Sequence, residues 1–254
     1  MLVQVFQSPE PEQSRISAIW ILGFWGFMKV TVIIPALNEA ETLPRLLAAI
    51  PRIEGCEMET IVVDNGSTDE TGQVAEKAGA EVVRESRRGY GWACHAGVRA
   101  AIESDVIVFL DGDYSFDPKE MSVLLEPIKA GRADLVLGSR LLSGKAQAML
   151  PHQAFGNRLT AFLMRRLYGL NVTDIAPYRA VRTELLNALD MREMTFGYPT
   201  EMLVKAARRN ARILEAPVSF LPRYAGRSKI SGTLRGTVLA AWFILATTFR
   251  YARS

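Results

Sequence analysis

Short apolar runs alternate with helix-like stretches through the first half of the chain. The runs are rich in Val and Ile, and in each following stretch apolar residues recur every three or four positions. This alternation predicts an α/β fold, with a Rossmann-like, doubly wound, mostly parallel sheet and helices on both faces. The expected strands are residues 30–35, 60–64, 81–84, 106–111 and 134–138, and the expected helices are residues 39–50, 68–78, 90–102 and 118–130.

The rhythm changes after Gly138. Helical patterns are expected over residues 154–168, 184–189 and 200–208, with a short apolar stretch at 178–181. A strand-like run at 213–221 precedes a basic segment at 223–229. Because we find no internal repeat or long linker, both halves are expected to form one domain.

Two apolar segments near the ends of the chain, residues 18–28 and 237–249, are too short to cross a bilayer, which takes about 20 residues. The first lacks the basic start and cleavage site of a signal peptide, so residues 1–28 are expected to form a poorly ordered extension. The second is apolar around nearly its whole circumference. Residues 233–254 are therefore predicted to form a helix that packs on protein, joins an oligomer or lies at a membrane surface.

Composition and charge narrow the function classes. The chain has 254 residues, 49% of them hydrophobic, and a net charge of +3. This charge is too weak to indicate a nucleic-acid partner, but it suits a phosphate-bearing ligand or an anionic membrane. The two cysteines, Cys56 and Cys94, form neither a disulfide framework nor a zinc motif, which favours a reducing compartment.

Acidic residues follow two of the apolar runs. Asp64 closes one strand, and Asp111 and Asp113 follow the most apolar one. Ligands of doubly wound sheets bind at the carboxyl ends of the strands, where Pro35 and Arg140 are also expected. Three carboxylates at one edge repel each other unless cations offset them. The pattern therefore predicts a hard-oxygen site for Mg²⁺ or Mn²⁺ that bridges to phosphates of a substrate.

The segment after the first expected strand excludes a dinucleotide-binding fingerprint. That fingerprint needs G-x-G-x-x-G directly after the strand, whereas residues 35–39 here are Pro-Ala-Leu-Asn-Glu. Asn38 is also a typical helix N-cap with Glu41 as its capping-box partner. Capping and contact with a ligand are both consistent with this segment.

Four motifs in order make the chain recognisable: VIIPALNE (32–39), VVDNGSTD (62–69), FLDGDYSF (109–116) and AGRSKISG (225–232). Together they resemble the family 2 glycosyltransferases with a GT-A fold, and within them the polyprenyl-phosphate mannose and glucose synthases. The resemblance covers residues 29–232, which we therefore assign to a single GT-A domain.

The resemblance implies a role for each matching residue. The positions expected to contact the nucleoside are Pro35, Asn38, Glu39 and Asp64. The D-x-D motif comprises Asp111, Gly112 and Asp113; its two acids are catalytic and metal-ligating candidates, Asp113 the more direct ligand of Mg²⁺ or Mn²⁺. Arg140 is expected near the phosphates or the donor sugar. The basic loop expected to fold over the diphosphate contains Arg223, Ser228 and Lys229.

The acceptor half departs from the family pattern. Residues 176–179 are Ala-Pro-Tyr-Arg, where related synthases often carry Ser-Gly-Phe-Arg or Gly-Asp-Phe-Arg. We therefore take the nearby Asp174 as the displaced acid and a third catalytic candidate. The basic residues predicted to hold an acceptor phosphate include Arg158 and Arg179.

The activity implied by the resemblance is inverting transfer of a hexose from a nucleotide-diphosphate sugar, of the UDP-Glc or GDP-Man class, to a polyprenyl phosphate. A phosphate acceptor is largely ionised near neutral pH, so it needs cations rather than a general base. Two alternatives stay open: a soluble transferase with a small hydroxyl acceptor, and a non-catalytic nucleotide-sugar binder. The expected location is the cytoplasm, peripheral at the inner face of the membrane, and a homo-oligomer stays open.

Overall fold

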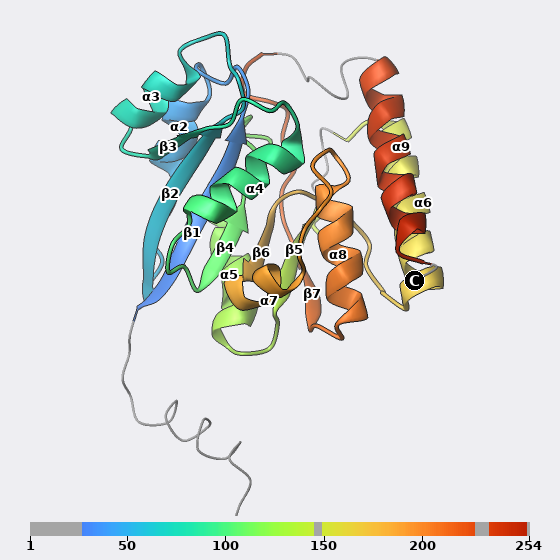
Figure 1. Cartoon of the computed structure of the whole chain (residues 1–254). Coiled ribbons are helices and arrows are strands. Elements are labelled where there is room, and N and C mark those ends of the chain that lie inside the picture. The colour runs from blue at the N-terminus through green and yellow to red at the C-terminus, as the bar shows by residue number, and fades with distance from the viewer. Residues whose placement is uncertain (1–26, 145–148, 227–233, 253–254) are drawn as a thin grey trace, which may run out of the picture.

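The computed structural model describes residues 27–144, 149–226 and 234–252, and within them one seven-stranded sheet of order β3-β2-β1-β4-β6-β5-β7 (Figure 1). β6 is antiparallel to β4 and β5, and the other neighbours pair in parallel. The doubly wound, mostly parallel sheet predicted from the sequence is confirmed. The strands are β1 (Met28–Ala36), β2 (Cys56–Asp64), β3 (Glu81–Arg84), β4 (Val106–Phe109), β5 (Leu135–Ser139), β6 (Arg179–Arg182) and β7 (Ile213–Pro217).

Helices cover both faces of the sheet because side chains alternate between the faces along each strand. In β1, Val32 and Ile34 belong to one buried cluster and Ile33 to the other. The helices that pack into the first cluster are α2 (Leu43–Ala49), α3 (Thr71–Lys77) and α5 (Met121–Lys129), with the 3-10 turn η1 (Pro118–Glu120) before α5. Those of the second cluster are α4 (Tyr90–Ala100), α6 (Pro151–Tyr168), α7 (Thr183–Ala188) and α8 (Tyr198–Arg208).

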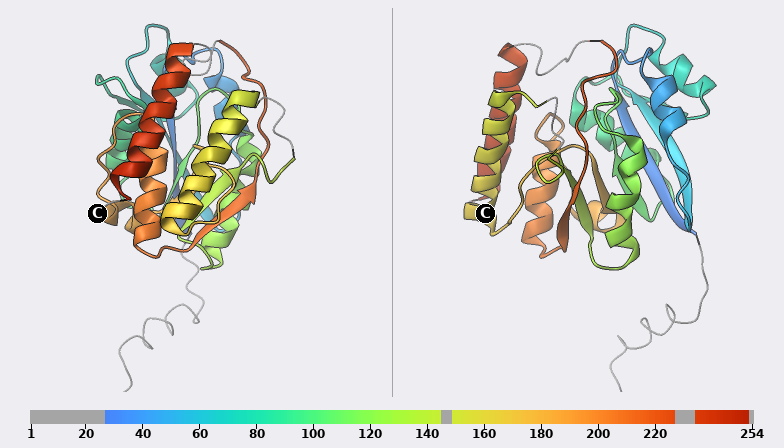
Figure 2. Two further views of the ribbon diagram at one scale, coloured as in Figure 1. Left: turned by 90° about the vertical axis from the view of Figure 1, so that its right-hand side faces the viewer. Right: turned by 180° about the vertical axis from the view of Figure 1, so that it is seen from behind.

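The last helix, α9 (Leu234–Arg250), lies beside α6 and packs on α6 and α8, at the side of the molecule away from β3 (Figures 1 and 2). The Tyr168 hydroxyl donates to the Thr248 carbonyl, and the Tyr251 hydroxyl donates to the Glu201 carboxylate. The apolar segment 237–249 thus packs on protein along one side. Across the ranges that the structure describes, we find no helix with the length and hydropathy needed to cross a membrane.

The helix expected from Glu39 begins later than the sequence predicted, and the N-cap assignment of Asn38 was wrong. The N-cap of α2 is Thr42. Asn38 has a positive φ of 52°, and its side-chain oxygen accepts from the Thr68 amide at 2.8 Å. The tie to the loop after β2 holds Asn38 outside the helix. Asn38 thereby joins the loops at the carboxyl ends of β1 and β2.

The boundaries of the predicted domain fall partly outside the described structure. β1 begins at Met28, one residue before the predicted start of the domain. Residues 1–26 of the predicted extension lie outside the described residues. The predicted boundary at residue 233 falls directly before α9. That it separates two domains stays a prediction.

Candidate active site

The acidic loop after β4 lies at the carboxyl edge of the sheet. β4 ends at Phe109, and the Leu110 amide still donates to the Ile33 carbonyl, so Asp111 and Asp113 leave the sheet beside β1. Asp113 Oδ1 accepts from the Ser115 amide at 2.9 Å. The local turn therefore fixes the orientation of this carboxylate.

Asp111 lies between two buried residues, Leu110 and Gly112. Burial, and secondarily the charge of Asp113, raise the pKa of Asp111 from 3.8 to about 7. The Tyr90 hydroxyl donates to Asp111 Oδ1 at 3.4 Å, which opposes that rise only weakly. A cation between the two carboxylates would stabilise the ionised form of both.

Arg223 bridges two predicted site residues. Its Nη1 donates to Asp113 Oδ2 at 2.5 Å and its Nη2 donates to Glu39 Oε1 at 2.7 Å. The main chain supports this position, since the Tyr224 amide donates to the Asp113 carbonyl at 3.2 Å. The segment after β7 is therefore fastened to the acidic loop, with a guanidinium on the acid expected to hold a metal.

A second basic side chain lies at the end of β5. Three groups of Arg140, its amide, Nε and Nη2, donate to the fully buried Asp174 carboxylate at 2.7–2.8 Å. Glu215 in β7 accepts from the Asp174 amide at 2.9 Å and thereby fixes the loop that carries Asp174. Both oxygens of Asp174 are thus occupied by Arg140. This geometry positions the Arg140 guanidinium. A role of Asp174 in proton transfer stays a prediction.

The loops after β1 and β2 are tied to each other. Asp64 Oδ1 accepts from the Ser67 amide at 2.8 Å, and the Ser67 hydroxyl accepts from the Asn38 amide at 2.9 Å. Pro35 and Asp64 are half-buried, and Asn38 is exposed. The predicted nucleoside-contacting residues therefore gather at two neighbouring strand ends, and their contact with a nucleoside stays a prediction.

The remaining predicted residues are spread more widely. Gly112 is a buried residue of the acidic loop, between Asp111 and Asp113, and Arg158 is exposed on α6. Arg179 is 1% exposed and donates to the Pro199 and Ala176 carbonyls, so the structure places it in the core and not on a ligand-accessible surface. Ser228 and Lys229 lie outside the described residues.

Several residues near the site carried no signal in the sequence analysis. The Arg45 guanidinium lies 4.5 Å from the ring centre of Tyr224 and 5.6 Å from that of Tyr114, next to Asp113 in the chain. The side-chain amide of Asn65 donates to the Glu85 and Arg87 carbonyls and so fixes the loop before α4. These contacts join segments distant in sequence. A local signal exists for Asn65 alone, because Asp-Asn-Gly at residues 64–66 is a composition typical of turns.

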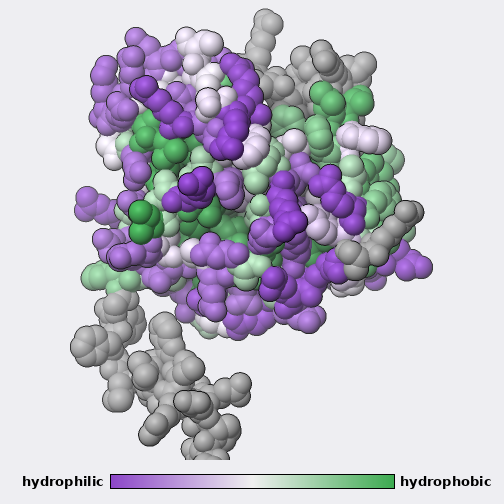
Figure 3. Space-filling view, viewed as in Figure 1, coloured by the Kyte–Doolittle hydropathy of each residue, from purple (hydrophilic) through white to green (hydrophobic). Residues whose placement is uncertain are grey.

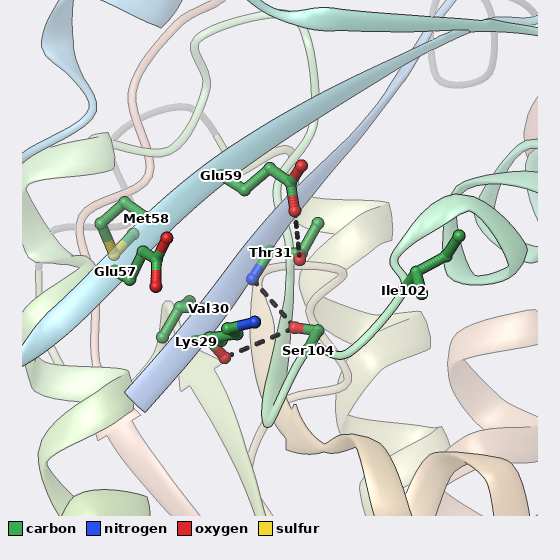
Figure 4. Close-up of a pocket in the computed structure, with 8 residues that line it drawn as sticks. All are labelled: Lys29, Val30, Thr31, Glu57, Met58, Glu59, Ile102 and Ser104. Carbon is green, nitrogen blue, oxygen red and sulfur yellow. Dashed lines mark hydrogen bonds between the residues drawn. The ribbon is translucent and has the colours of Figure 1, made fainter. Parts of the chain in front are cut away.

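A cavity of about 400 Å³ lies at the opposite end of β1, lined by residues that include Lys29, Glu57 and Ser104 (Figure 4). Some of its polar groups pair with one another: the Thr31 amide donates to the Ser104 hydroxyl, and the Thr31 hydroxyl donates to Glu59. The cavity lies at the amino ends of the strands, away from the acidic loop. It is therefore no part of the candidate site.

The carboxylates of the acidic loop fit a divalent cation that shares its ligands with a substrate. In the part of the chain that the structure describes, we find no cluster of three or more His, Cys, Asp or Glu side chains suited to hold a metal. Mg²⁺ is often held by one or two carboxylates, with substrate phosphates and water completing its shell. Asp111 and Asp113 match such a donor set.

The chain is similar in sequence to several proteins with glycosyltransferase names. The chain is 37% identical over 226 residues to an undecaprenyl-phosphate mannosyltransferase of Micrococcus luteus, an alignment that covers 82% of this chain and 90% of the relative. It is 32% identical to the polyprenol monophosphomannose synthase of Mycolicibacterium smegmatis, with 81% and 82% covered. An uncharacterized glycosyltransferase of Mycobacterium tuberculosis shares 43% identity over 212 residues, with 83% and 94% covered.

A solved structure supports the fold. Glucosyl-3-phosphoglycerate synthase from Mycobacterium tuberculosis, in complex with Mn²⁺, UDP and glucosyl-3-phosphoglycerate, matches with a TM-score of 0.71 at 23% identity. The match covers 98% of this chain and 86% of that chain. It supports the GT-A type of α/β fold expected from the motifs. The family model for glycosyl transferase family 2 matches residues 31–190, more than half of the sequence, and the chain belongs to this family of glycosyltransferases.

Proposed function

We propose that this glycosyltransferase moves a hexose from a nucleotide-diphosphate sugar, of the UDP-Glc or GDP-Man class, to a polyprenyl phosphate, with inversion at the anomeric carbon. The observation that carries the proposal is the meeting of Asp111, Asp113 and Arg223 at the carboxyl edge of the sheet. The names of the relatives support the lipid phosphate as acceptor.

The donor would bind with its diphosphate over the acidic loop. Asp111 and Asp113 would hold Mg²⁺ or Mn²⁺ there, and a bound ion of this kind supplies Lewis-acid stabilisation of the leaving diphosphate. Arg223 offers a further cation at the same place, 21% exposed and in contact with Asp113. Pro35, Asn38, Glu39 and Asp64, at the ends of β1 and β2, would contact the nucleoside.

The acceptor phosphate would lie toward Arg140. Asp174 accepts one hydrogen bond from the Arg140 amide and two from its guanidinium, so the cation is already oriented before a substrate arrives. An ionised phosphate oxygen is nucleophilic without a base, which agrees with the full engagement of Asp174 by Arg140. A transferase of this kind would act peripherally at the inner face of the membrane, where its acceptor lies.

Transfer of radiolabelled hexose tests the proposal. The purified protein with Mg²⁺ or Mn²⁺ is supplied with UDP-glucose or GDP-mannose, and detergent-dispersed undecaprenyl phosphate is compared with 3-phosphoglycerate and with small alcohols. Label should appear in the organic phase, with the anomeric configuration opposite to that of the donor. Label in a water-soluble product alone would favour the small hydroxyl acceptor. Binding of the donor without any transfer would favour a nucleotide-sugar binder.

A further inference from the structure

Exposed apolar side chains form one face across α6 and α9. On α6, Phe155, Leu159 and Phe162 are 70%, 39% and 62% exposed, and their spacing of four and three residues aligns them along the helix. On α9, Val238 and Trp242 are 59% and 66% exposed. Figure 3 shows hydrophobic residues over α9 at the right-hand margin of the molecule. We name this set, with Leu239 and Phe249, the α6/α9 face.

The α6/α9 face is held rigidly against the protein. On the inner side of α9, Thr247 and Thr248 are fully buried, and Arg250 pairs with the Glu193 carboxylate at 3.3 Å. The two helices contact each other and lie side by side in the left-hand view of Figure 2. The outward apolar residues are therefore displayed on a fixed surface.

The charge on these two helices has one sign. The sequences of α6 and α9 contain no Asp or Glu, whereas Arg158, Arg165 and Arg166 are exposed on α6 and Arg250 on α9. Exposed aromatic side chains with arginines and without acids are typical of helices that lie in the headgroup region of an anionic bilayer. At 17 residues, α9 is about 25 Å long, which suits a helix lying along the surface.

A second copy of the chain fits this face less well than a lipid surface does. A two-fold dimer would place the same patch against itself and would bring arginines of one copy toward those of the other, without acids of α6 or α9 to pair them. Anionic headgroups supply the missing negative charge. The apolar side chains would enter the acyl boundary beside them.

The face is connected to the acceptor side of the active site. The side chain of Asn157 in α6 donates to the Thr173 carbonyl at 3.1 Å and accepts from the Ile175 amide at 3.2 Å. These two residues flank Asp174, which fixes Arg140. α6 thus links the exposed apolar surface to the cation proposed for the acceptor phosphate.

From these observations we infer that the α6/α9 face is a docking surface for a bilayer rich in anionic lipid. The inference rests on the proposed function, since docking would bring the enzyme to a polyprenyl phosphate held in a bilayer. The docking itself can be measured without any transfer of sugar.

Sedimentation with vesicles tests the docking. The full-length protein should bind phosphatidylglycerol vesicles strongly and pure phosphatidylcholine vesicles weakly. The combined variant Phe155→Ser/Phe162→Ser/Trp242→Ser should lose at least tenfold in affinity, and Arg165→Gln/Arg166→Gln should weaken binding and its salt dependence. Ile102→Ser, which changes a side chain that is 77% exposed near the amino end of β4, is the matched control and should bind like the parent. Circular dichroism and a melting curve check that each variant folds.

Three outcomes would overturn the inference. One is that anionic vesicles at low salt do not retain the parent protein. Another is that binding is lost in Trp25→Ser, a change in the apolar segment 18–28, while the triple variant binds normally. The third is a dimer, detected by light scattering, that the triple variant dissociates with no effect on lipid binding. Activity separates this inference from the proposed function. In detergent the triple variant should transfer sugar like the parent, and in vesicles it should not. Absence of transfer by the parent in detergent would contradict the proposed function alone.

Discussion

Arg223 occupies the carboxylate oxygen of Asp113 that faces away from the turn: Nη1 lies 2.5 Å from Asp113 Oδ2, while Oδ1 accepts from the Ser115 amide. A guanidinium and a divalent cation cannot both contact this oxygen at full strength, since like charges repel at such distances. Under the proposed function, Arg223 would compete with the metal for this carboxylate in the absence of donor. It would become available to a diphosphate once it leaves Asp113.

This competition predicts that Arg223→Gln binds Mn²⁺ more tightly in the absence of nucleotide, on the order of tenfold, because a charge-assisted hydrogen bond of about 1.5–3 kcal/mol no longer has to be broken. Electron paramagnetic resonance of free Mn²⁺ measures this affinity directly. The same variant should bind UDP more weakly in the presence of metal. Arg132→Gln removes an equal charge from an exposed pair with Glu126 and serves as the control. Weaker Mn²⁺ binding in Arg223→Gln would mean that the arginine supports the site instead of competing for it.

Asp113→Ala should abolish transfer, by at least a thousandfold, and leave the fold intact. The described contacts of this partly exposed side chain are those to the Ser115 amide and to Arg223, so its removal opens no core cavity. Activity is measured by transfer of labelled sugar, and folding by circular dichroism. Asp117→Ala is the control: it removes an acid four residues away that caps η1, which should cost about 1 kcal/mol of stability and spare transfer. Substantial turnover in Asp113→Ala would remove this acid from the mechanism.

The raised pKa of Asp111 predicts two opposite pH dependences. Its pKa is about 7 in the folded protein against 3.8 for an ordinary aspartate, so between these values the folded state binds the proton that the unfolded state has released. Stability from this group is therefore greatest below pH 4 and falls as pH rises toward 7, by at most about 1.4 kcal/mol per unit. Asp111→Asn should flatten this part of the profile in chemical denaturation.

Mn²⁺ requires the ionised form of Asp111, so its affinity should change in the other direction. Below pH 7 the affinity should fall by about tenfold per unit as a proton competes with the metal. Titration calorimetry in two buffers of different ionisation enthalpy should detect a proton released on binding at pH 6. An affinity that is constant from pH 5 to 7.5 would contradict the assignment of Asp111 as a ligand.

The parallel strands of the sheet were predictable because each is marked by an apolar run in its own short stretch of sequence. All four residues of β4 are buried, and an uninterrupted apolar run of this kind predicts a strand covered on both faces. β6 was described only as a short apolar stretch. Its sequence, RAVR, carries no sign of direction, and its antiparallel position between β4 and β5 comes from pairing with distant strands.

The candidate site also contains residues that a local pattern predicts and contacts that only the fold creates. Asp111 and Asp113 were predictable because they are neighbours at one strand end. The contact of Arg223 with Glu39 joins residues 184 positions apart, and no local pattern contains it. Arg179 shows the limit of residue type as evidence. A charge in the acceptor half suggested a phosphate ligand, whereas the side chain lies in the core and its two terminal nitrogens donate to main-chain carbonyls.

Asp174→Ala should destabilise the protein by about 3 kcal/mol, since it leaves Arg140 without its buried partner. If Asp174 positions Arg140, the variant should also raise KM for the acceptor more than it lowers kcat. Arg140→Met/Asp174→Ala should recover part of the lost stability but not the acceptor KM, which separates the two effects. A loss confined to kcat, with KM unchanged and a new pH dependence, would instead support proton transfer by Asp174.

Two helical glycines predict opposite effects of the same substitution. A Cβ on Gly97 in α4 would lie 2.5 Å from Ile33 Cγ2 and 3.1 Å from Val63 Cγ2, in the core between α4 and the sheet. Overpacking of this kind typically costs 1–3 kcal/mol, about 1 kcal/mol of which the better helix propensity of alanine offsets. A Cβ on Gly156 in α6 would have no described atom within 4 Å apart from its chain neighbours and the backbone of its own helix. Urea denaturation should therefore show Gly97→Ala less stable than the parent and Gly156→Ala more stable by about 1 kcal/mol, and equal shifts of one sign would contradict the close packing of α4 on β1.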